Sequence, residues 1–387
     1  MKLNYLLISF MIVFCLISGS AKACTAFQLK SQEGASIYCR SMEFEFALHS
    51  ELLIVPRSTE FVGTAPQKAI GMQWKCKYGY VGMNLAFAPT CITDGMNEKG
   101  LVVGSLYLPG LAKYERPDPM RSEETLGPWE LPNFLLGMCA SIEDVKNALQ
   151  DILVAQEPPP GMGEFILPLH FYISDRSGKA IVVEYIKGEK QVHDNPIGVL
   201  TNSPSFDWHL INLRNYLNLS PVDIDQLDLR NLSLHKFGTG SGLLRIPGDY
   251  TPPSRFLRAS FFSQWAAPQK TAEETVKMGF HILNTFDIFE GIVRLKRAYG
   301  KQKNPIPTGK TLVASGEIYD EEITEWIVVH DQTNLKTYFR NYDSLRIQMA
   351  DLKKIDFSQP GFRKIPMLSE FSVDDVTNNI LPLKMGH

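Results

Sequence analysis

The chain has 387 residues, of which 44% are hydrophobic and 21% are charged, and its formal net charge is −3. This composition is that of an ordinary globular protein and leaves enough apolar residues for a large buried core. A charge so close to neutral gives no basis for binding nucleic acid or an acidic membrane surface, so neither is expected as a partner.

The first 23 residues have the pattern of a secretory signal. Lys2 precedes an apolar run over 6–17, small residues follow, and the segment ends in Ala21-Lys22-Ala23. The apolar run is shorter than the roughly 20 residues that span a bilayer, and no later run is long enough. The sequence therefore predicts a signal peptide over 1–23, export to the periplasm or the medium, and one domain over 24–387.

Cleavage after Ala23 would make Cys24 the first residue of the mature protein, with an α-amino group and a thiol on the same residue. A free α-amine titrates near about 8, so part of it is unprotonated at neutral pH and can act as a base. Cys24 would then supply both nucleophile and base. A lipoprotein cysteine also follows a signal, although such sites usually have Leu three residues earlier, where this chain has Ala21. A lipid-anchored, non-catalytic binding protein therefore stays open.

Four further cysteines lie in the mature chain, at Cys39, Cys76, Cys91 and Cys139. In an oxidising compartment they are enough for up to two disulfides, whose connectivity the sequence does not give. Buried free thiols are the alternative.

Strand-like runs dominate the rest of the chain, with a few amphipathic helices among them. Two helices are predicted by capping-box residues, Ser141 with Asp144 and Thr271 with Glu274, each followed by apolar residues at helical spacing. Pro252-Pro253 is expected to lie in a loop. The pattern predicts an α+β fold of stacked antiparallel sheets with helices outside. The predicted strands are 25–29, 35–39, 101–106, 171–174, 180–185, 198–201, 325–330 and 336–339.

The first two strands form a hairpin about a turn at 32–34. Pairing about residue 33 places Cys24 opposite Met42 and diagonal to Arg40, on one face of the sheet. A guanidinium there is expected to lower the pKa of the thiol and stabilise the thiolate. A one-residue slip would move Arg40 to the other face, and a surface salt bridge is its alternative role.

At these residues the chain resembles the choloylglycine hydrolase and penicillin V acylase family. The resemblance implies an N-terminal nucleophile hydrolase, a four-layer αββα sandwich that hydrolyses linear carbon–nitrogen amide bonds. Ordered blocks through most of the mature chain carry it: Cys-Thr-Ala-Phe at 24–27 with Arg40, then 94–101 with 105–110, 199–204 with 206–209, and 247–250 with 254–256.

The resemblance also implies the roles of the catalytic residues. Cys24 attacks the amide carbonyl and forms an acyl-thioester, while its own amine carries the proton. Asn202, through its side-chain amide, and Tyr107, through its backbone N–H, stabilise the negative charge of the tetrahedral intermediate. Arg255 helps to hold the nucleophile and its surroundings. Without the resemblance, Asn202 would be a turn residue, Tyr107 a half-buried strand aromatic and Arg255 a surface arginine.

One position departs from the family pattern. The family usually has Asp three residues after the first arginine, near the amine, and this chain has Glu43. The carboxylate is retained but reaches one methylene further. Strict strand alternation places Glu43 away from Cys24, so its role near the amine requires a bend or a strand end at this point.

No cofactor or metal ion is expected. The eight histidines show no ligand spacing such as H-x-x-x-H. His209, beside Trp208, is interpreted as a packing or orienting residue rather than as a Cys–His partner. A papain-like cysteine hydrolase is a further alternative, but the chain lacks a Cys-Trp motif and a downstream His–Asn pair.

The substrate is expected to be an acylated small molecule. Bile-salt hydrolases often carry Asn where this chain has Tyr107, and penicillin V acylases often carry Tyr. The export signal and the aromatic residues Phe44, Trp74 and Trp129 resemble the exported Gram-negative branch, which acts on penicillin V and in some members on N-acyl homoserine lactones. A conjugated bile-salt hydrolase is the alternative, and a homo-oligomer stays open.

Overall fold

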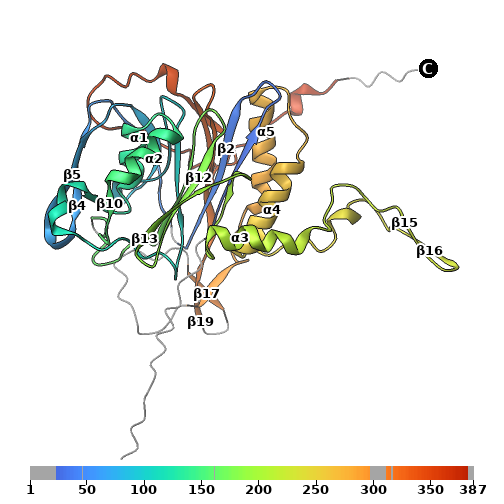
Figure 1. Cartoon of the computed structure of the whole chain (residues 1–387). Coiled ribbons are helices and arrows are strands. Elements are labelled where there is room, and N and C mark those ends of the chain that lie inside the picture. The colour runs from blue at the N-terminus through green and yellow to red at the C-terminus, as the bar shows by residue number, and fades with distance from the viewer. Residues whose placement is uncertain (1–22, 46, 161, 297–310, 315–316, 382–387) are drawn as a thin grey trace, which may run out of the picture.

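The computed structural model describes residues 23–45, 47–160, 162–296, 311–314 and 317–381 (Figure 1). Apart from Ala23, the predicted signal peptide lies outside the described residues. No helix in these ranges is long and apolar enough to cross a membrane.

Two antiparallel sheets form the centre of the molecule (Figure 1). The six-stranded sheet has, in spatial order, β14 (Val199–Leu200), β1 (Cys24–Lys30), β2 (Ser36–Phe44), β20 (Ile323–Asp331), β21 (Lys336–Asn341) and β22 (Gln348–Asp351). The eight-stranded sheet has β13 (Glu189–Asp194), β12 (Ala180–Ile186), β11 (Leu169–Ser174), β8 (Val102–Tyr107), β7 (Ala88–Asn97), β6 (Tyr80–Leu85), β3 (Leu52–Val55) and β23 (Arg363–Ile365). Each of the eight predicted strands is present. Most central strands are buried along their whole length, because each sheet is covered on both faces.

Helices cover the outer face of each sheet, which gives the predicted αββα layers (Figure 1). On the eight-stranded sheet, α1 (Leu131–Met138) packs on β7 and β8 and is followed by α2 (Ile142–Asp151). On the six-stranded sheet, α4 (Pro252–Trp265) packs on β1, while α5 (Ala272–Leu283) packs on β2 and β20. The short helix α3 (Phe206–Asn212) contacts α4.

The two helices predicted from capping residues are α2 and α5. In α5 the box is complete, since Thr271 Oγ1 accepts the Glu274 N–H and Glu274 accepts the Thr271 N–H. In α2 the Ser141 hydroxyl accepts the Asp144 N–H, but Asp144 accepts from Ala140, so only the serine half of the predicted box forms.

The loop expected at Pro252-Pro253 is wrong, because these prolines begin α4. The first turn of a helix has N–H groups without helical partners, so prolines cost nothing there. Arg255 follows two residues later, so this candidate site residue lies on a helix and not next to a loop.

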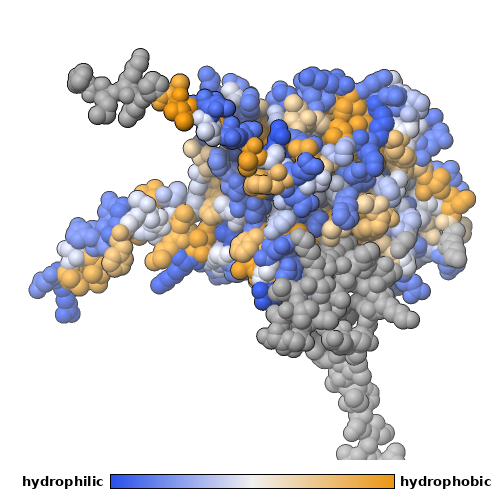
Figure 2. All heavy atoms as spheres, turned by 180° about the vertical axis from the view of Figure 1, so that it is seen from behind, coloured by the Kyte–Doolittle hydropathy of each residue, from blue (hydrophilic) through white to orange (hydrophobic). Residues whose placement is uncertain are grey.

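Smaller elements surround the sandwich. A two-stranded arm projects from the body beyond α3 and carries exposed leucines that are visible from behind (Figure 2). The arm consists of β15 (Gln226–Leu229) and β16 (Leu232–His235). The other small sheets are β4 (Glu60–Ala65) with β5 (Ala69–Lys75), β9 (Thr125–Leu126) with β10 (Leu153–Val154), and β19 (Glu317–Glu321) between β17 (Arg294–Lys296) and β18 (Thr311–Ala314).

The cysteines of the described residues are all free and buried. Of the two possibilities left open by the sequence, buried thiols are therefore the correct one for Cys39, Cys76, Cys91 and Cys139.

Candidate active site

Cys24 lies at the start of β1, in the hairpin register that the sequence predicts. Cys24 pairs with Met42 and Ala26 pairs with Arg40. The Arg40 guanidinium consequently reaches the thiol, with Nη2 3.7 Å from Sγ. The alternative of a surface salt bridge is excluded because Arg40 is fully buried.

A buried polar network fixes the Arg40 guanidinium. Its Nη1 lies 3.1 Å from Asp94 Oδ2, and both side chains are fully buried. The second oxygen of Asp94 lies 2.7 Å from His330 Nε2, and the Tyr38 hydroxyl donates to Asp94 Oδ2 at 2.8 Å. Arg40 also donates to the Ser105 carbonyl. Because the carboxylate of Asp94 balances its charge, the guanidinium can remain buried beside the thiol.

The expected depression of the thiol pKa is wrong for the chain as it stands. Burial raises the pKa of Cys24 above its ordinary value, and the positive charge of Arg40 only partly offsets this effect. Removing a thiolate from water disfavours the charged form more strongly than one guanidinium at 3.7 Å favours it. The thiol therefore stays protonated at neutral pH and needs a base to react.

The peptide bond between Ala23 and Cys24 lies inside the site. The Ala23 carbonyl accepts the Glu43 N–H at 3.0 Å, and the Ala23 N–H donates to the Glu322 carboxylate. The Cys24 N–H donates to Asn202 Oδ1 at 2.8 Å. The nitrogen that would become the α-amine thus already has a polar partner in the unprocessed chain.

Asn202 is held by contacts at both ends of its side-chain amide. Its Oδ1 accepts the Cys24 N–H and, at 2.7 Å, Arg255 Nη2, while its Nδ2 donates to the Tyr107 carbonyl at 2.9 Å. Two donors face one atom and an acceptor faces the other, so the amide has only one satisfactory orientation. Nδ2 has two N–H groups, and the bond to Tyr107 uses one of them.

Arg255 reaches the nucleophile from α4 on the outer face of the sheet. Its Nη1 donates to the Cys24 carbonyl and, at 2.8 Å, to Thr25 Oγ1, and its Nε donates to the Tyr250 carbonyl at 2.9 Å. Arg255 is 0% exposed, which excludes an ordinary surface arginine. The side chain ties α4, the start of β1 and Asn202 together.

Tyr107 is the last residue of β8 and lies across the site from β1. The Leu108 N–H donates to the Pro168 carbonyl of the segment before β11 at 2.7 Å. Because successive N–H groups of a strand point to opposite edges, the Tyr107 N–H points away from β11. The Tyr107 ring meets Phe44 edge-on, with ring centroids 5.8 Å apart.

Glu43 follows an irregularity in β2 that supplies the predicted bend. The register with β20 shifts between Met42 and Glu43, so the alternation of side chains is interrupted there. Glu43 is 0% exposed, and neither carboxylate oxygen has a hydrogen-bond partner in the described part of the chain. Burial raises the pKa of Glu43 to about 8, although the positive charge of Arg255 and the nearby Ser41 hydroxyl oppose this shift. The Ser41 oxygen likewise lacks a hydrogen bond of good geometry among the described residues.

In the chain that retains Ala23, Glu43→Gln should remove a pH-dependent loss of stability. Between its ordinary pKa of 4.5 and the raised value of about 8, the folded state keeps a proton that the unfolded state releases. The free energy of unfolding of the wild type should therefore fall as the pH rises through this window, by about 1.4 kcal/mol per pH unit at most. Urea unfolding at pH 5 and pH 8 should show that Glu43→Gln gains stability relative to the wild type at the higher pH.

Glu33→Gln is the control for this measurement, because Glu33 is exposed in the turn of the same hairpin. It should leave the pH dependence of stability unchanged. If the free energies of unfolding of Glu43→Gln and the wild type differ by the same amount at both pH values, the result would contradict a raised pKa for Glu43.

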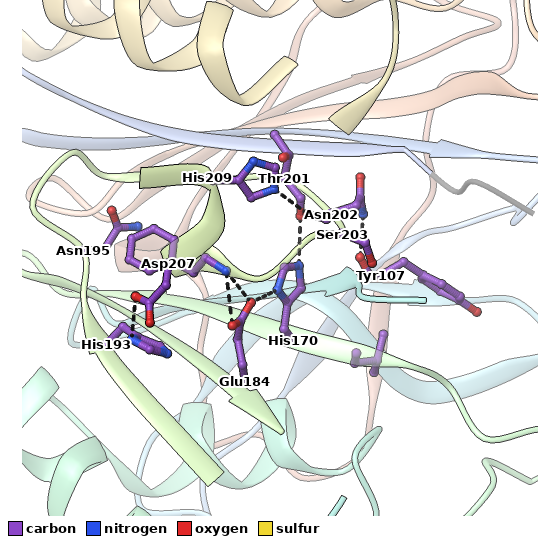
Figure 3. A network of polar contacts seen from close by, with 12 residues as sticks. Tyr107, His170, Glu184, His193, Asn195, Thr201, Asn202, Ser203, Asp207 and His209 are labelled. Carbon is purple, nitrogen blue, oxygen red and sulfur yellow. Dashed lines mark hydrogen bonds and ion pairs between the residues drawn. The ribbon is translucent and has the colours of Figure 1, made fainter. Parts of the chain in front are cut away.

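Several buried polar residues of the site were missed by sequence reasoning. His330 supports Arg40 through Asp94, and Asp94 itself was noted only as part of a matching block. His170 and Glu184 lie beneath the segment that carries Asn202 (Figure 3). No short spacing joins these residues in the sequence, so only the tertiary contacts show them.

His209 has the orienting role that the sequence indicated. Its ring stacks on Phe256 at 4.4 Å between centroids, and its Nε2 lies 2.8 Å from the Asn202 carbonyl. Burial lowers the pKa of His209 to about 4, so the ring is uncharged at neutral pH. Among the described residues, no three His, Cys, Asp or Glu side chains gather in a way that could hold a metal ion.

Comparisons with known proteins agree with this geometry. The family described as linear amide C–N hydrolases, choloylglycine hydrolase family, matches residues 24–365. A bile salt hydrolase/transferase of Clostridium perfringens is 36% identical over 282 residues, which are 70% of this chain and 81% of that protein. A penicillin V acylase of Pectobacterium atrosepticum is 27% identical over 361 residues, which are 91% of this chain and 86% of that protein.

Solved structures give the same result for the fold. A variant of the conjugated bile acid hydrolase of Clostridium perfringens superposes with a TM-score of 0.76 at 28% identity, covering 92% of this chain and 100% of that one. The penicillin V acylase of Agrobacterium tumefaciens superposes with a TM-score of 0.66 at 23% identity, covering 89% and 91% of the two chains.

Proposed function

Because this chain belongs to the choloylglycine hydrolase family of linear amide C–N hydrolases, we propose that it is an exported amidase that cleaves acylated small molecules with Cys24 as an N-terminal nucleophile. One observation carries the proposal. The thiol of Cys24 lies beside the Arg40 guanidinium, while the nitrogen of the same residue contacts Asn202 Oδ1. Removal of residues 1–23 would turn that nitrogen into an amine within reach of its own thiol.

The proposed reaction has two halves. The α-amine of Cys24 takes the thiol proton, and the thiolate attacks the amide carbonyl carbon to form a tetrahedral intermediate. The intermediate collapses to an acyl-thioester, and the protonated α-amine returns its proton to the leaving amine. Water then attacks the thioester with the α-amine as base, which releases the acid and restores the thiol.

Charge stabilisation in this scheme comes from both sides of the thiol. Arg40 stabilises the thiolate, which matters because burial alone raises the thiol pKa. The N–H of Asn202 Nδ2 that does not bond to the Tyr107 carbonyl and the backbone N–H of Tyr107 would donate to the negative oxygen of the intermediate. Arg255 would hold the carbonyl of Cys24 and the amide of Asn202 in place.

Glu43 would orient the α-amine once residues 1–23 are removed. Its buried carboxylate has no hydrogen-bond partner among the described residues, and its backbone N–H contacts the carbonyl that cleavage would remove. An ammonium group nearby would supply both the missing donors and the compensating charge.

The substrates proposed are acyl amides like penicillin V or the N-acyl homoserine lactones. The tyrosine at 107 supports this choice, since penicillin V acylases often carry tyrosine there. A conjugated bile-salt hydrolase is the second candidate, because a relative at 36% identity is a bile salt hydrolase/transferase. A lipid anchor at Cys24 would block its thiol and leave a non-catalytic binding protein.

Intact-mass analysis of the exported protein tests the first step. Loss of residues 1–23 should leave a chain that begins at Cys24 with an unmodified amine and thiol. A mass increased by lipid acyl groups would favour the lipid-anchored alternative, and an active enzyme with another N-terminus would contradict the mechanism.

Hydrolysis of a panel of amides tests the substrate. The purified mature protein should release amine from penicillin V or a long-chain N-acyl homoserine lactone with a higher kcat/KM than from glycocholate or taurocholate, and penicillin G tests the fit of the acyl group. Faster cleavage of the bile salts would establish the second candidate. Failure on every amide would contradict the proposed substrate class.

A further inference from the structure

Two buried histidines hold the backbone on either side of Asn202 (Figure 3). His170 Nε2 lies 2.9 Å from the Thr201 carbonyl, and His209 Nε2 lies 2.8 Å from the Asn202 carbonyl. A carbonyl can only accept, so each Nε2 carries a hydrogen. These carbonyls belong to the two peptide groups that flank the Cα of residue 202, and fixing both groups fixes the direction of its side chain.

A carboxylate orients the first of these histidines. Glu184 Oε1 lies 3.0 Å from His170 Nδ1, and the same carboxylate accepts the Phe206 N–H at the start of α3. His170 and Glu184 are both 0% exposed. Because Nε2 donates to a carbonyl and Nδ1 faces a carboxyl group, a second hydrogen lies between Nδ1 and Glu184. Every polar atom of the imidazole then has a partner, as a buried polar group requires.

The contact joins the two sheets at the candidate site. His170 lies on β11 and Glu184 on β12 of the eight-stranded sheet, whereas Thr201 follows β14 of the six-stranded sheet. Asn202 has partners on both sides as well, Cys24 on β1 and Tyr107 on β8. The position of its amide thus depends on contacts with both sheets, and His170 supplies one of those contacts from the eight-stranded sheet.

We propose that His170, which Glu184 holds in place, is a positioning residue that acts through Asn202, an inference that rests on the proposed function. Asn202 must place one N–H at the reacting oxygen while its Oδ1 holds the nitrogen of Cys24. A displacement of about 1 Å at such a group can lower the rate about 100-fold, even when the change lies away from the chemistry.

A second histidine–carboxylate pair beside the same helix provides a matched control (Figure 3). His193 Nδ1 lies 3.3 Å from Asp207 Oδ1, and the Asp207 side chain is 65% exposed. Within the described residues, no hydrogen bond joins this pair to residues 201–203. Like His170 and Glu184, this pair joins an imidazole to a carboxyl group. Unlike them, it makes no described hydrogen bond to the segment that carries Asn202.

Two substitutions of His170 separate positioning from packing. The glutamine amide reaches about as far as the distal ring nitrogen, so His170→Gln can still donate to the Thr201 carbonyl, whereas the shorter His170→Asn cannot. The kcat is calculated per folded active site, and these sites are counted by labelling of Cys24. On this basis His170→Asn should lower kcat about 10- to 100-fold with KM unchanged. His170→Gln should keep most of the wild-type kcat, and Asp207→Asn should keep all of it.

A double-mutant cycle tests whether the effect passes through Asn202. In the Asn202→Ala background, His170→Asn should cause no further loss of kcat, because the group that it positions is absent. A loss that adds fully to that of Asn202→Ala would overturn the proposal. An equal loss in His170→Gln and His170→Asn would also overturn it, since that result indicates packing alone.

Alkylation of Cys24 by iodoacetamide gives a readout that needs no substrate. Its rate in the mature protein should fall in His170→Asn and in Asn202→Ala, and it should not change in Asp207→Asn. If the wild type cleaves no amide of the panel, the proposed function fails while this measurement still decides the positioning role. An unchanged alkylation rate in His170→Asn would then overturn the inference.

Discussion

Cys24→Ser should lower the kcat for amide hydrolysis by about three orders of magnitude or more and leave the fold intact. A serine hydroxyl is far less acidic than a thiol, so the α-amine can no longer generate a useful nucleophile at neutral pH. The substitution changes one buried atom, which makes weak hydrogen bonds with Met42 Sδ and Arg40 Nη2, each 3.7 Å from Sγ. Amine release by the mature variant, together with its thermal unfolding curve, measures both effects.

Cys39→Ala is the matched control for this result. Cys39 lies on the neighbouring strand and is fully buried, but it faces α5 at Gly279 rather than the site. Its loss should lower Tm through the cavity that it leaves, and turnover per folded molecule should persist. Substantial turnover by Cys24→Ser would identify a different nucleophile.

Asn202→Ala should lower kcat by about 10²–10³ with little change in KM. An oxyanion donor acts on charge that is present only in the transition state, so its removal affects kcat rather than substrate binding. The same substitution also leaves the Cys24 nitrogen and Arg255 without the oxygen that they share. Steady-state kinetics on the best amide of the panel measures the split between kcat and KM.

Asn202→Asp separates the two ends of the side chain. It keeps an oxygen for Cys24 and Arg255, but it replaces the donor that faces the Tyr107 carbonyl by a second oxygen. If the N–H of Nδ2 acts in the oxyanion hole, Asn202→Asp should be as impaired as Asn202→Ala. An active aspartate variant, or an effect on KM alone, would make Asn202 a substrate-positioning or turn residue.

Local features of the sequence determined the parts of the site that depend on neighbouring residues. The turn at 32–34 set the register of the first hairpin and thus placed Arg40 beside Cys24, because pairing in a tight hairpin follows from the length of its turn. The break in alternation at Glu43 was also predicted, since no regular strand can bring that side chain near the amine. The matching blocks gave the family, and with it the αββα layers.

Three features were decided by the tertiary structure. Burial outweighs Arg40 and raises the pKa of Cys24, because desolvation depends on every group packed around the thiol and not on its nearest charge alone. Pro252 begins the helix that carries Arg255, because proline is compatible with a first helical turn as well as with a loop, and the packing of α4 on β1 stabilises the helix. His170 and Glu184 lie beneath Asn202 because the two sheets face each other, a contact between distant segments that no local pattern encodes.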